Sequence, residues 1–456
     1  MNNSKPVKHS DHKTMDIIDY DTAIEYLYSL ELFGIKLGLD NITRIMEKLG
    51  NPHTDLKFIH VAGTNGKGSV CAMLSSVLAE AGYKVGLYSS PHLRSFRERI
   101  AVNSERIPRE RVVSLTKQLQ QTALEIESET EAHPTYFEIT TAMALKYFQE
   151  VEVDIAVMEV GMGGRFDATN IITPLVSVIT DISLDHTEYL GEKLEKISFE
   201  KAGIIKDRIP VITSNQKPEA MEVIENISKE NSSELFALDQ DFNFELIEAN
   251  ENGVKLNAVY NDRFGTGIRF ENLSIPFIGR FQAQNCAVAL AVVAMLTNSG
   301  WDIPKDSIYS GLQKVSWPAR VQVMQRSPTV ILDCSHNPSG ISYLVETIED
   351  LFEYNKIIFV IGVVKEKARG EIVKLISALN PEVIAVKPAS HRALEPEVLQ
   401  AEFREAGVEC SVKSDVLQGV EDALKQAGPT DLVCITGSFY TAGAAMEHWQ
   451  KAEKSI

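Results

Sequence analysis

The sequence predicts an α/β protein of two domains: a P-loop-containing ATPase domain with a mostly parallel sheet and a small antiparallel sheet, then a smaller Rossmann-like, doubly wound C-terminal domain. Two observations carry this prediction. Between residues 58 and 82 an apolar run, a glycine-rich turn with one lysine and a helical pattern follow one another. From Val330 to Thr436, strand-like and helix-like segments alternate, which is typical of a parallel sheet.

The stretch FIHVAGTNGKGS, residues 58–69, is predicted to bind phosphate. Gly63, Gly66 and Gly68 remove side chains where the backbone must turn sharply and present several N–H groups to one anion, and Lys67 adds a positive charge. A glycine-rich turn between core elements is the plain alternative, but the strand before it and the helix after it favour phosphate. The common pattern G-x-x-x-x-G-K-[ST] is not met, because its first glycine is missing and Gly68 separates the lysine from the serine. Ordinary GTPases and kinases are therefore poor models for this loop.

Composition narrows the class of protein. At 456 residues, with 44% hydrophobic and 24% charged residues, the chain is expected to be a soluble globular protein of two or three domains. Its formal charge of −18 disfavours nucleic acid and anionic membrane as partners. Five scattered cysteines without a C-x-x-C pair indicate reduced thiols and a cytoplasmic location. No apolar run approaches the ~20 residues of a membrane span. Residues 1–15 are expected to form a disordered tail, and nothing demands more than a monomer.

The first domain is predicted to span residues 1–316. A helical period from Asp21 to Leu49, broken near its two central glycines, predicts two helices joined by a loop. Asn252-Gly253 predicts a hairpin within 234–276, and a second pair of strands is expected to follow it in a small antiparallel sheet. The other predicted elements are strands at Val85–Tyr88, Val153–Gly161 and Pro174–Thr180 and helices at Arg109–Glu129, Phe137–Gln149 and Arg280–Leu296.

The second domain is predicted to span residues 317–456, with a hinge at Trp317–Arg320 where the pattern resets. Its predicted strands are Val330–Asp333, Ile357–Val363, Val383–Val386, Glu409–Val412 and Leu432–Thr436. Its predicted helices are Pro338–Leu351, Glu371–Leu379, Pro396–Ala406 and Val416–Gln426.

Four polar side chains of the first domain are candidates for chemistry: Ser90, Glu159, His186 and Lys201. Parallel sheets hold ligands beyond the carboxyl ends of their strands, where Ser90 and Glu159 are predicted to lie. A buried carboxylate is costly unless it is paired or metal-bound, and hydroxyl and carboxylate oxygens suit Mg²⁺. Taken alone, His186 would more often be a core histidine, and Lys201 a solvated charge.

Three polar loops are predicted at one edge of the second sheet: residues 333–338, 365–367 and 436–439. Helix caps and turns would explain each of them separately. Their shared position favours a ligand site.

Beyond these patterns, a series of longer motifs carries a resemblance to a known family. In chain order they are GTNGKGS, SSPHL, TYFEITTAMAL, EVGMGGRFDATN, LDHTEYLG, EKAGIIK, WPAR and DCSHNP. Together they resemble the folylpolyglutamate synthase and dihydrofolate synthase family of the Mur ligase superfamily, from about Leu37 onward. The resemblance implies an ATP- and magnesium-dependent ligase that joins L-glutamate to dihydropteroate, or to the γ-carboxyl of tetrahydrofolate, through an acyl phosphate.

The resemblance also implies roles for individual residues. ATP would be bound by Gly63, Thr64, Asn65, Gly66, Lys67, Gly68, Ser69, Asn285, Arg320 and Asp333. Magnesium, in two ions, would be bound by Ser90, Glu159, His186 and Lys201 as its carbamate, and the catalytic set would be Lys67, Glu159, His186 and Lys201. The pterin substrate would contact Leu37, Gly38, Thr135, Tyr136, Phe137, Glu138, Phe166, Asp167 and Ala168, while His336 and Ser438 are candidates for holding glutamate.

The match has departures, and alternatives stay open. Lys36 stands where some family members have an acid, and the loops at 334–335 and 365–367 differ mildly from the family's pattern. Two rivals are a cell-wall amino-acid ligase, whose additional N-terminal domain we do not expect here, and a nucleotide-dependent switch protein. The sequence leaves open whether the first glutamate, later glutamates or both are added, although SSPHL and TYFE resemble bifunctional bacterial members. Domain closure about the hinge is expected, because ATP would contact both domains.

Overall fold

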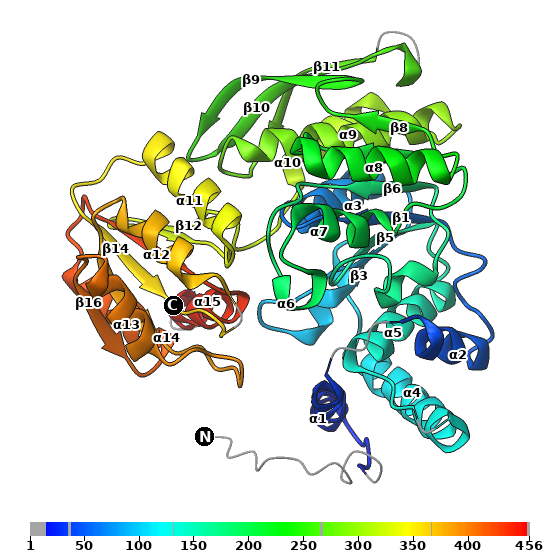
Figure 1. Ribbon diagram of the computed structural model, residues 1–456, viewed down its shortest axis with the longest axis horizontal. Helices are drawn as coiled ribbons and strands as arrows, with labels where there is room; N and C mark the ends of the chain where they lie inside the picture. The colour runs from blue at the N-terminus through cyan, green and yellow to red at the C-terminus, as the bar shows by residue number, and fades with distance from the viewer. Residues whose placement is uncertain (1–14, 35–37, 131, 265–267, 366, 454–456) are drawn as a thin grey trace.

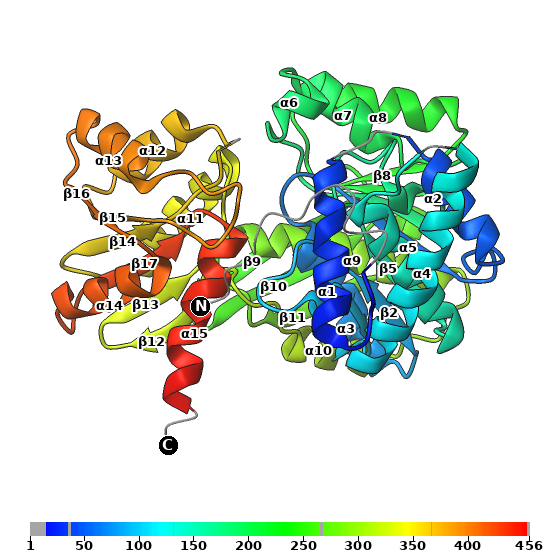
Figure 2. The same ribbon diagram turned by 90° about the horizontal axis from the view of Figure 1, so that it is seen from below.

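Three sheets organise the computed structural model, which describes residues 15–34, 38–130, 132–264, 268–365 and 367–453 (Figure 1). The predicted tail lies outside the described residues except for Met15, whose carbonyl accepts a hydrogen bond from Gln120. In Figures 1 and 2 the chain from the hinge onward, yellow to red, lies beside the earlier part, blue to light green.

Eight strands form the first sheet in the order β4-β3-β2-β5-β1-β6-β7-β8. Only β3 runs against the others, and it pairs antiparallel with β2 and with the edge strand β4. The strands are β1 Phe58–Ala62, β2 Val85–Tyr88, β3 Ile100–Val102, β4 Glu105–Arg106, β5 Ile155–Glu159, β6 Val176–Ile179, β7 Val211–Thr213 and β8 Leu235–Ala237. Because β1, β5 and β6 are buried on both faces, their apolar runs are continuous rather than alternating.

Helices cover both faces of this sheet and include every helix predicted for the first domain. The α-helices are α1 Tyr20–Ser29, α2 Asp40–Lys48, α3 Lys67–Glu80, α4 Arg109–Thr130, α5 Tyr136–Glu150, α6 Thr187–Leu190, α7 Leu194–Ala202, α8 Pro218–Glu230, α9 Phe281–Asn298 and α10 Lys305–Lys314. The short 3₁₀ helices are η2 Leu30–Phe33, η3 Phe96–Arg99, η4 Ala168–Ile171 and η5 Asp262–Phe264. The turn between β1 and α3 lies at the carboxyl edge of the sheet, where the sequence predicted the phosphate loop.

The small antiparallel sheet has three strands in the order β11-β10-β9. Strands β9 (Phe242–Asn250) and β10 (Gly253–Tyr260) form the predicted Asn252-Gly253 hairpin. The expected second pair of strands is wrong: only β11 (Arg269–Ile275) follows in the described part of the chain, and β8 joins the first sheet instead. Helix α9 packs between this sheet and α3. It is long and apolar enough to cross a membrane, but 72% of it is buried inside the protein, which makes it a core helix.

The third sheet has six strands in the order β12-β13-β17-β14-β15-β16, parallel except for β12. Its strands are β12 Gln322–Arg326, β13 Thr329–Leu332, β14 Ile357–Ile361, β15 Glu382–Val386, β16 Cys410–Lys413 and β17 Leu432–Thr436. Its helices are α11 Pro338–Leu351, α12 Arg369–Ser377, α13 Pro396–Glu405, α14 Val416–Gln426 and α15 Phe439–Glu453. The doubly wound prediction is confirmed, but the edge strand β12 and the last helix α15 were not predicted.

Two side chains from before the hinge join the core of this last part. Ile278 lies in one of its two apolar clusters, and Leu93 packs against the other. A methyl group placed on Gly443 of α15 would lie 2.0 Å from the carbonyl oxygen of Leu93, so this helix touches the loop after β2 closely. The division into domains at residue 317 stays a prediction, and these contacts cross it.

A buried histidine in β1 predicts acid sensitivity. His60 is fully buried, its Nε2 lies 2.8 Å from Thr169 Oγ1, and burial lowers its pKa to about 3. The unfolded chain binds a proton on this histidine below pH ~6.5, whereas the folded protein keeps it neutral. His60 therefore costs no stability above that pH, and the free energy of unfolding decreases as the pH falls from there toward 3. Between pH 7.5 and pH 5 we expect a loss of about 2 kcal/mol in the free energy of unfolding from this group. Urea unfolding at the two pH values should show a smaller loss for His60→Asn, and an unchanged loss for His448→Asn in α15.

Candidate active site

The glycine-rich turn is held in place by the loop that follows β6. Thr64 donates its N–H to Asp181 O (2.6 Å) and its hydroxyl to Ser183 O (3.0 Å), and Asn65 Nδ2 reaches Asp181 Oδ2 at 3.3 Å. A methyl group on Gly63 (φ +146°) would lie 1.9 Å from Thr180 Oγ1, so this position requires glycine. The first N–H groups of α3 have no acceptor within the helix, which suits an anion at its N-terminus.

Two lysine side-chain nitrogens meet at this turn. Lys67 Nζ donates to Gly63 O (3.0 Å) and Thr64 O (3.1 Å), and Lys201 Nζ donates to Gly63 O (2.7 Å) from helix α7. Burial, reinforced by the charge of Lys67, lowers the pKa of Lys201 to about 7. A large part of Lys201 is therefore an uncharged amine at neutral pH, which is the form that reacts with carbon dioxide.

Glu159 lies at the end of β5, next to Ser90. Its Oε2 accepts the Ser90 N–H at 3.0 Å, and burial raises its pKa although Lys67 works in the opposite direction. No ion pair compensates this buried carboxylate among the described residues, and its oxygen donors suit Mg²⁺. His186, in a left-handed conformation (φ 52°) at the start of α6, has its pKa lowered to about 3 by burial, so it is a neutral imidazole.

The donor set fits magnesium only together with oxygens from a ligand. Within the described residues, no group of three His, Cys, Asp or Glu side chains is arranged to hold a metal ion. Glu159, the Ser90 hydroxyl and phosphate oxygens would provide the hard donors that Mg²⁺ prefers. The predicted metal roles of Ser90, Glu159, His186 and Lys201 remain predictions.

One predicted nucleotide residue outside the loop, Asn285 of helix α9, contacts it, and so does Trp317 of the hinge, which was not among the predicted site residues. Asn285 lies directly over the loop, because a methyl group on Gly66 would be 2.4 Å from its Oδ1. Trp317 covers Gly68 in the same way, with Nε1 2.7 Å from such a methyl group. This contact explains the glycine that separates lysine from serine in this variant loop.

The hinge itself is strained and well anchored. Ala319 (φ 57°) and Val321 (φ 50°) adopt left-handed conformations, which cost a β-branched residue about 1–3 kcal/mol. Asp333 accepts the N–H of Val321 (3.1 Å) and of Ser335 (2.7 Å), so its carboxylate orders the hinge as well as the loop after β13. The guanidinium of Arg320 lies 5.3 Å from the centre of the Phe439 ring.

A buried acid that the sequence analysis did not select links the two parts of the chain. Asp185, after β6, accepts hydrogen bonds from Lys367 Nζ (2.5 Å) and Asn337 Nδ2 (3.1 Å), and His336 Nε2 lies 3.6 Å away. Although burial opposes the charge, His336 and Lys367 hold the pKa of Asp185 well below its usual range. Asn337 also donates to Asn65 Oδ1 (3.1 Å), so the loops of the last sheet contact the phosphate loop directly.

Among the residues predicted to contact the pterin substrate, some hold the backbone by hydrogen bonds or packing, and one has an exposed side chain. Thr135 and Glu138 form a capping box at the start of α5, and Asp167 accepts four hydrogen bonds within its own loop. Phe137 lies against the backbone of Gly161, while Phe166 is 36% exposed. Leu37 lies outside the described residues. Tyr136 begins α5, Ala168 begins η4, and Gly38 lies just before α2.

The two candidates for holding glutamate also have structural partners. Ser438 Oγ accepts the N–H of Thr441 (3.0 Å) and so caps α15, and His336 Nδ1 lies 2.9 Å from Cys334 O. The His336 ring packs 5.6 Å from that of Phe439. Helix capping therefore accounts for Ser438 without a ligand, and its role in binding stays a prediction.

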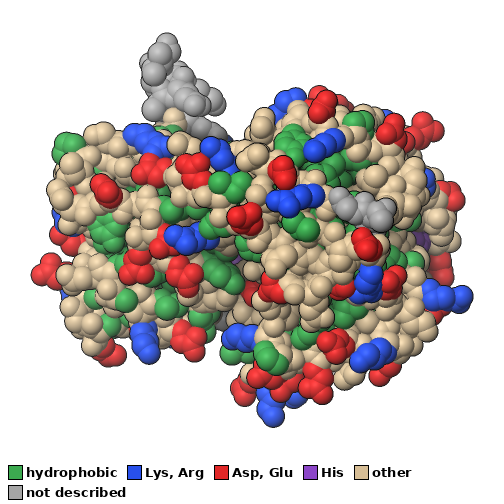
Figure 3. All heavy atoms as spheres, turned by 90° about the horizontal axis from the view of Figure 1, so that it is seen from above, with side chains coloured by type: hydrophobic (Ala, Val, Ile, Leu, Met, Phe, Trp, Pro, Cys, Tyr) green, Lys and Arg blue, Asp and Glu red, His purple; other side chains and the backbone are tan. Residues whose placement is uncertain are grey.

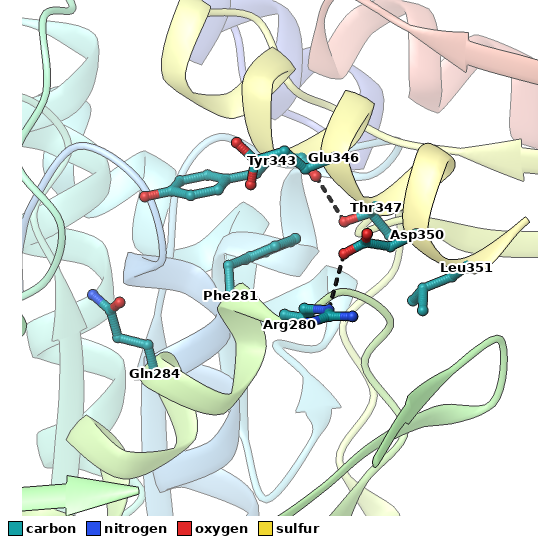
Figure 4. A pocket seen from close by; sticks show the side chains of 8 residues that line it. All are labelled: Arg280, Phe281, Gln284, Tyr343, Glu346, Thr347, Asp350 and Leu351. Carbon is teal, nitrogen blue, oxygen red and sulfur yellow. Dashed lines mark hydrogen bonds and ion pairs between the residues drawn. The ribbon is translucent and has the colours of Figure 1, made fainter. Parts of the chain in front are cut away.

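A narrow cavity of about 150 Å³ lies between the start of α9 and the face of α11 (Figure 4). Its walls include the stacked rings of Phe281 and Tyr343, 5.2 Å apart, and the ion pair of Arg280 with Asp350 at 2.9 Å. None of the predicted site residues lines it. The predicted site residues lie instead around the glycine-rich turn, which Asn285 contacts one helical turn further along α9.

Two family models match the chain. The Mur ligase middle domain matches residues 61–293, and the Mur ligase glutamate ligase domain matches residues 319–439.

The chain is also similar to curated proteins and solved structures over nearly its full length. A Bacillus subtilis protein named "Dihydrofolate synthase/folylpolyglutamate synthase" is 34% identical over 92% of this chain and 97% of its own. An Escherichia coli FolC structure in complex with DHPP and ADP is 30% identical, with a TM-score of 0.84, over 96% of this chain and 99% of its own. A Haloferax volcanii protein named "Probable bifunctional folylpolyglutamate synthase/dihydropteroate synthase" is 33% identical over 95% of this chain, which spans only 51% of that relative.

Proposed function

Because this chain belongs to the folylpolyglutamate synthase and dihydrofolate synthase family of Mur ligases, we propose that it adds L-glutamate both to dihydropteroate and to the γ-carboxyl of tetrahydrofolate. It is an ATP-dependent acid–amino-acid ligase. The observation that carries the proposal is the contact of the phosphate loop with the loops of the last sheet, through Asn65, Asp185, Asn337 and Lys367.

The reaction needs a carboxylate to become electrophilic. Transfer of the γ-phosphoryl group of ATP to the acceptor carboxylate gives an acyl phosphate and ADP. Lys67 neutralises charge on the transferred group, while the N–H groups at the start of α3 orient it. The amine of glutamate then attacks the acyl carbon and expels inorganic phosphate.

Glutamate would arrive from the last sheet, with His336 and Ser438 as the residues that hold it. Asp185 lies 3.6 Å from the His336 imidazole and fixes its orientation. The Asp185–Lys367 pair, both side chains at least nine-tenths buried, closes the space between the two parts and excludes water from the acyl phosphate.

Ser90, Glu159, His186 and a carbamate on Lys201 would hold magnesium, which would supply positive charge to offset that of the phosphate groups. Neutral His186 and the largely uncharged amine of Lys201 favour this assignment, because an ammonium group would repel the metal.

The carbamate has a test of its own. We expect protein equilibrated with ¹³C-bicarbonate to show a carbamate carbon signal by NMR that weakens below pH 7, where Lys201 gains a proton. Lys201→Met should abolish the signal, whereas Lys206→Met, a half-buried neighbour, should keep it. An identical spectrum for the two variants would contradict the assignment.

We also propose that the enzyme is cytoplasmic and monomeric and acts only on small molecules. On the face shown in Figure 3, basic and acidic side chains are interspersed, and no basic stripe suited to nucleic acid crosses it.

One assay tests the proposed function. Purified protein is incubated with ATP, Mg²⁺ and glutamate, dihydropteroate or tetrahydrofolate is offered separately, and the products are weighed by mass spectrometry. A gain of one glutamate on each acceptor is expected, and a gain on neither would refute the proposal. A nucleotide-dependent switch would instead form ADP without any acceptor, and a cell-wall ligase would need a uridine nucleotide substrate.

A further inference from the structure

The guanidinium of Arg99, the last residue of η3, is a buried cation without a counter-ion in the part of the chain that the structure describes. Arg99 is 8% exposed, and its Nε donates to His92 Nδ1 at 2.8 Å. No carboxylate of the described residues pairs with it. Its charge acts on Glu31 and Glu159 only from a distance, where it opposes the rise in their pKa that burial causes. A buried charge without an ionic partner is costly, and contact with the Tyr136 ring, 5.2 Å away, recovers only part of that cost.

The side chains in direct contact with Arg99, His92 and Tyr136, add hydrogen-bonding capacity but no negative charge. His92 accepts from Arg99 through Nδ1, so its Nε2 carries the proton and donates to Tyr28 Oη at 3.1 Å. The Tyr136 hydroxyl is buried and has no hydrogen-bond partner among the described residues. The Tyr136 ring stacks on that of Tyr28 at 5.9 Å, and Arg99 lies over it, so a guanidinium without a carboxylate and a hydroxyl without a hydrogen-bond partner among the described residues belong to neighbouring side chains. A carboxylate would satisfy both of them.

This place adjoins the proposed reaction centre on the acceptor side. The carbonyl of Arg99 accepts the N–H of Ser89, and the next residue, Ser90, donates its N–H to Glu159. Tyr136 belongs to the segment predicted to contact the pterin substrate. The candidates for holding the incoming glutamate, His336 and Ser438, belong instead to the last sheet.

We propose that Arg99 and the Tyr136 hydroxyl bind the α-carboxylate of the terminal glutamate of a folate acceptor. This inference rests on the proposed function and extends it to acceptor specificity. In a folate acceptor three carbon atoms separate the α-carboxylate from the γ-carboxyl that reacts, so the α-carboxylate must be bound close to Ser90 and Glu159. Dihydropteroate has no second carboxylate, because its single carboxyl is attached to the aromatic ring. Arg99 therefore serves the later glutamate additions and not the first.

The test compares acceptors on the same variants. In Arg99→Gln we expect kcat/KM for tetrahydrofolate to fall about 100-fold, mainly through KM, since a buried charge-assisted contact is lost. The value for dihydropteroate should fall less than about threefold, because that acceptor makes no such contact. Arg99→Lys, which keeps the charge, should recover most of the loss, and Arg106→Gln in the exposed strand β4 should behave as wild type.

A modified substrate provides a second test of the role of Arg99. Tetrahydrofolate whose α-carboxylate is converted to an amide should be about 100-fold poorer for the wild type, yet no poorer than tetrahydrofolate itself for Arg99→Gln. This cycle does not depend on activity with dihydropteroate and is insensitive to a general loss of folding.

The outcomes separate this inference from the proposed function. Equal losses on both acceptors, an unchanged KM for tetrahydrofolate, or a raised KM for incoming glutamate with either acceptor would each overturn it. So would the same penalty for the amide in wild type and Arg99→Gln. If the wild type adds glutamate to neither acceptor, the proposed function fails, and this inference falls with it.

Discussion

Lys67→Ala is expected to lower the rate of ADP formation about 1,000-fold or more while leaving the fold intact. The ammonium group is the only side-chain cation among the described residues of the glycine-rich turn, and it donates to two carbonyls of that turn, so it would lie beside a phosphate bound there. Losing such a group at a phosphoryl-transfer site removes stabilisation that exists mainly in the transition state. Of the two carbonyls that Lys67 contacts, that of buried Gly63 keeps a second donor in Lys201 Nζ (2.7 Å), and Thr64 is only half-buried, so the fold should tolerate the loss.

Single-turnover measurement of ADP, with both acceptors supplied, checks this prediction. Lys217→Ala is the matched control, because Lys217 is an exposed cation whose charge also reaches the loop after β6. Thermal unfolding should give melting temperatures within a few degrees for both variants and the wild type. Normal turnover by Lys67→Ala would remove the phosphate assignment.

Asp185→Ala is expected to separate the two parts of the chain and to cost about 3–5 kcal/mol, because it leaves Lys367 buried without its partner. The Lys367 side chain is 6% exposed, and Asp185 Oδ1 is 2.5 Å from its ammonium group. Asn337 loses the same acceptor, so the contact of the last sheet with the phosphate loop weakens as well. Ligase activity should also decrease, because loss of this contact would expose the acyl phosphate to water.

Small-angle scattering of the free protein and urea unfolding together check this prediction. Asp185→Ala should have a larger radius of gyration and a lower unfolding midpoint than the wild type. The double variant Asp185→Ala/Lys367→Met should recover part of the stability, because it removes the unpaired charge, but not the activity. An unchanged radius and midpoint in the single variant would show that Asp185 does not hold the two parts together.

Local patterns were sufficient for most of the elements. The predicted α11, α14 and β17 coincide with the observed bounds, because Asn337 and Asp415 cap the two helices and the strand is a continuous apolar run. The missed strand β12, with the sequence QVMQR, is half-exposed at the edge of its sheet and lacks such a run. Helix α15 was missed because its apolar residues pack against β17 on one side and the Leu93 loop on the other, which blurs the helical period.

What the sequence determined by itself is the glycine-rich turn between β1 and α3, the two mostly parallel sheets and the family, since glycine, lysine and apolar runs act through backbone geometry and burial within short stretches. What only the tertiary structure decided is which charges meet. The pair of Asp185 with Lys367, the unpaired Arg99 and the Trp317 ring over Gly68 join residues far apart in the chain. The strength of each contact comes from mutual burial, and no local pattern encodes the distance between side chains that the fold alone brings together.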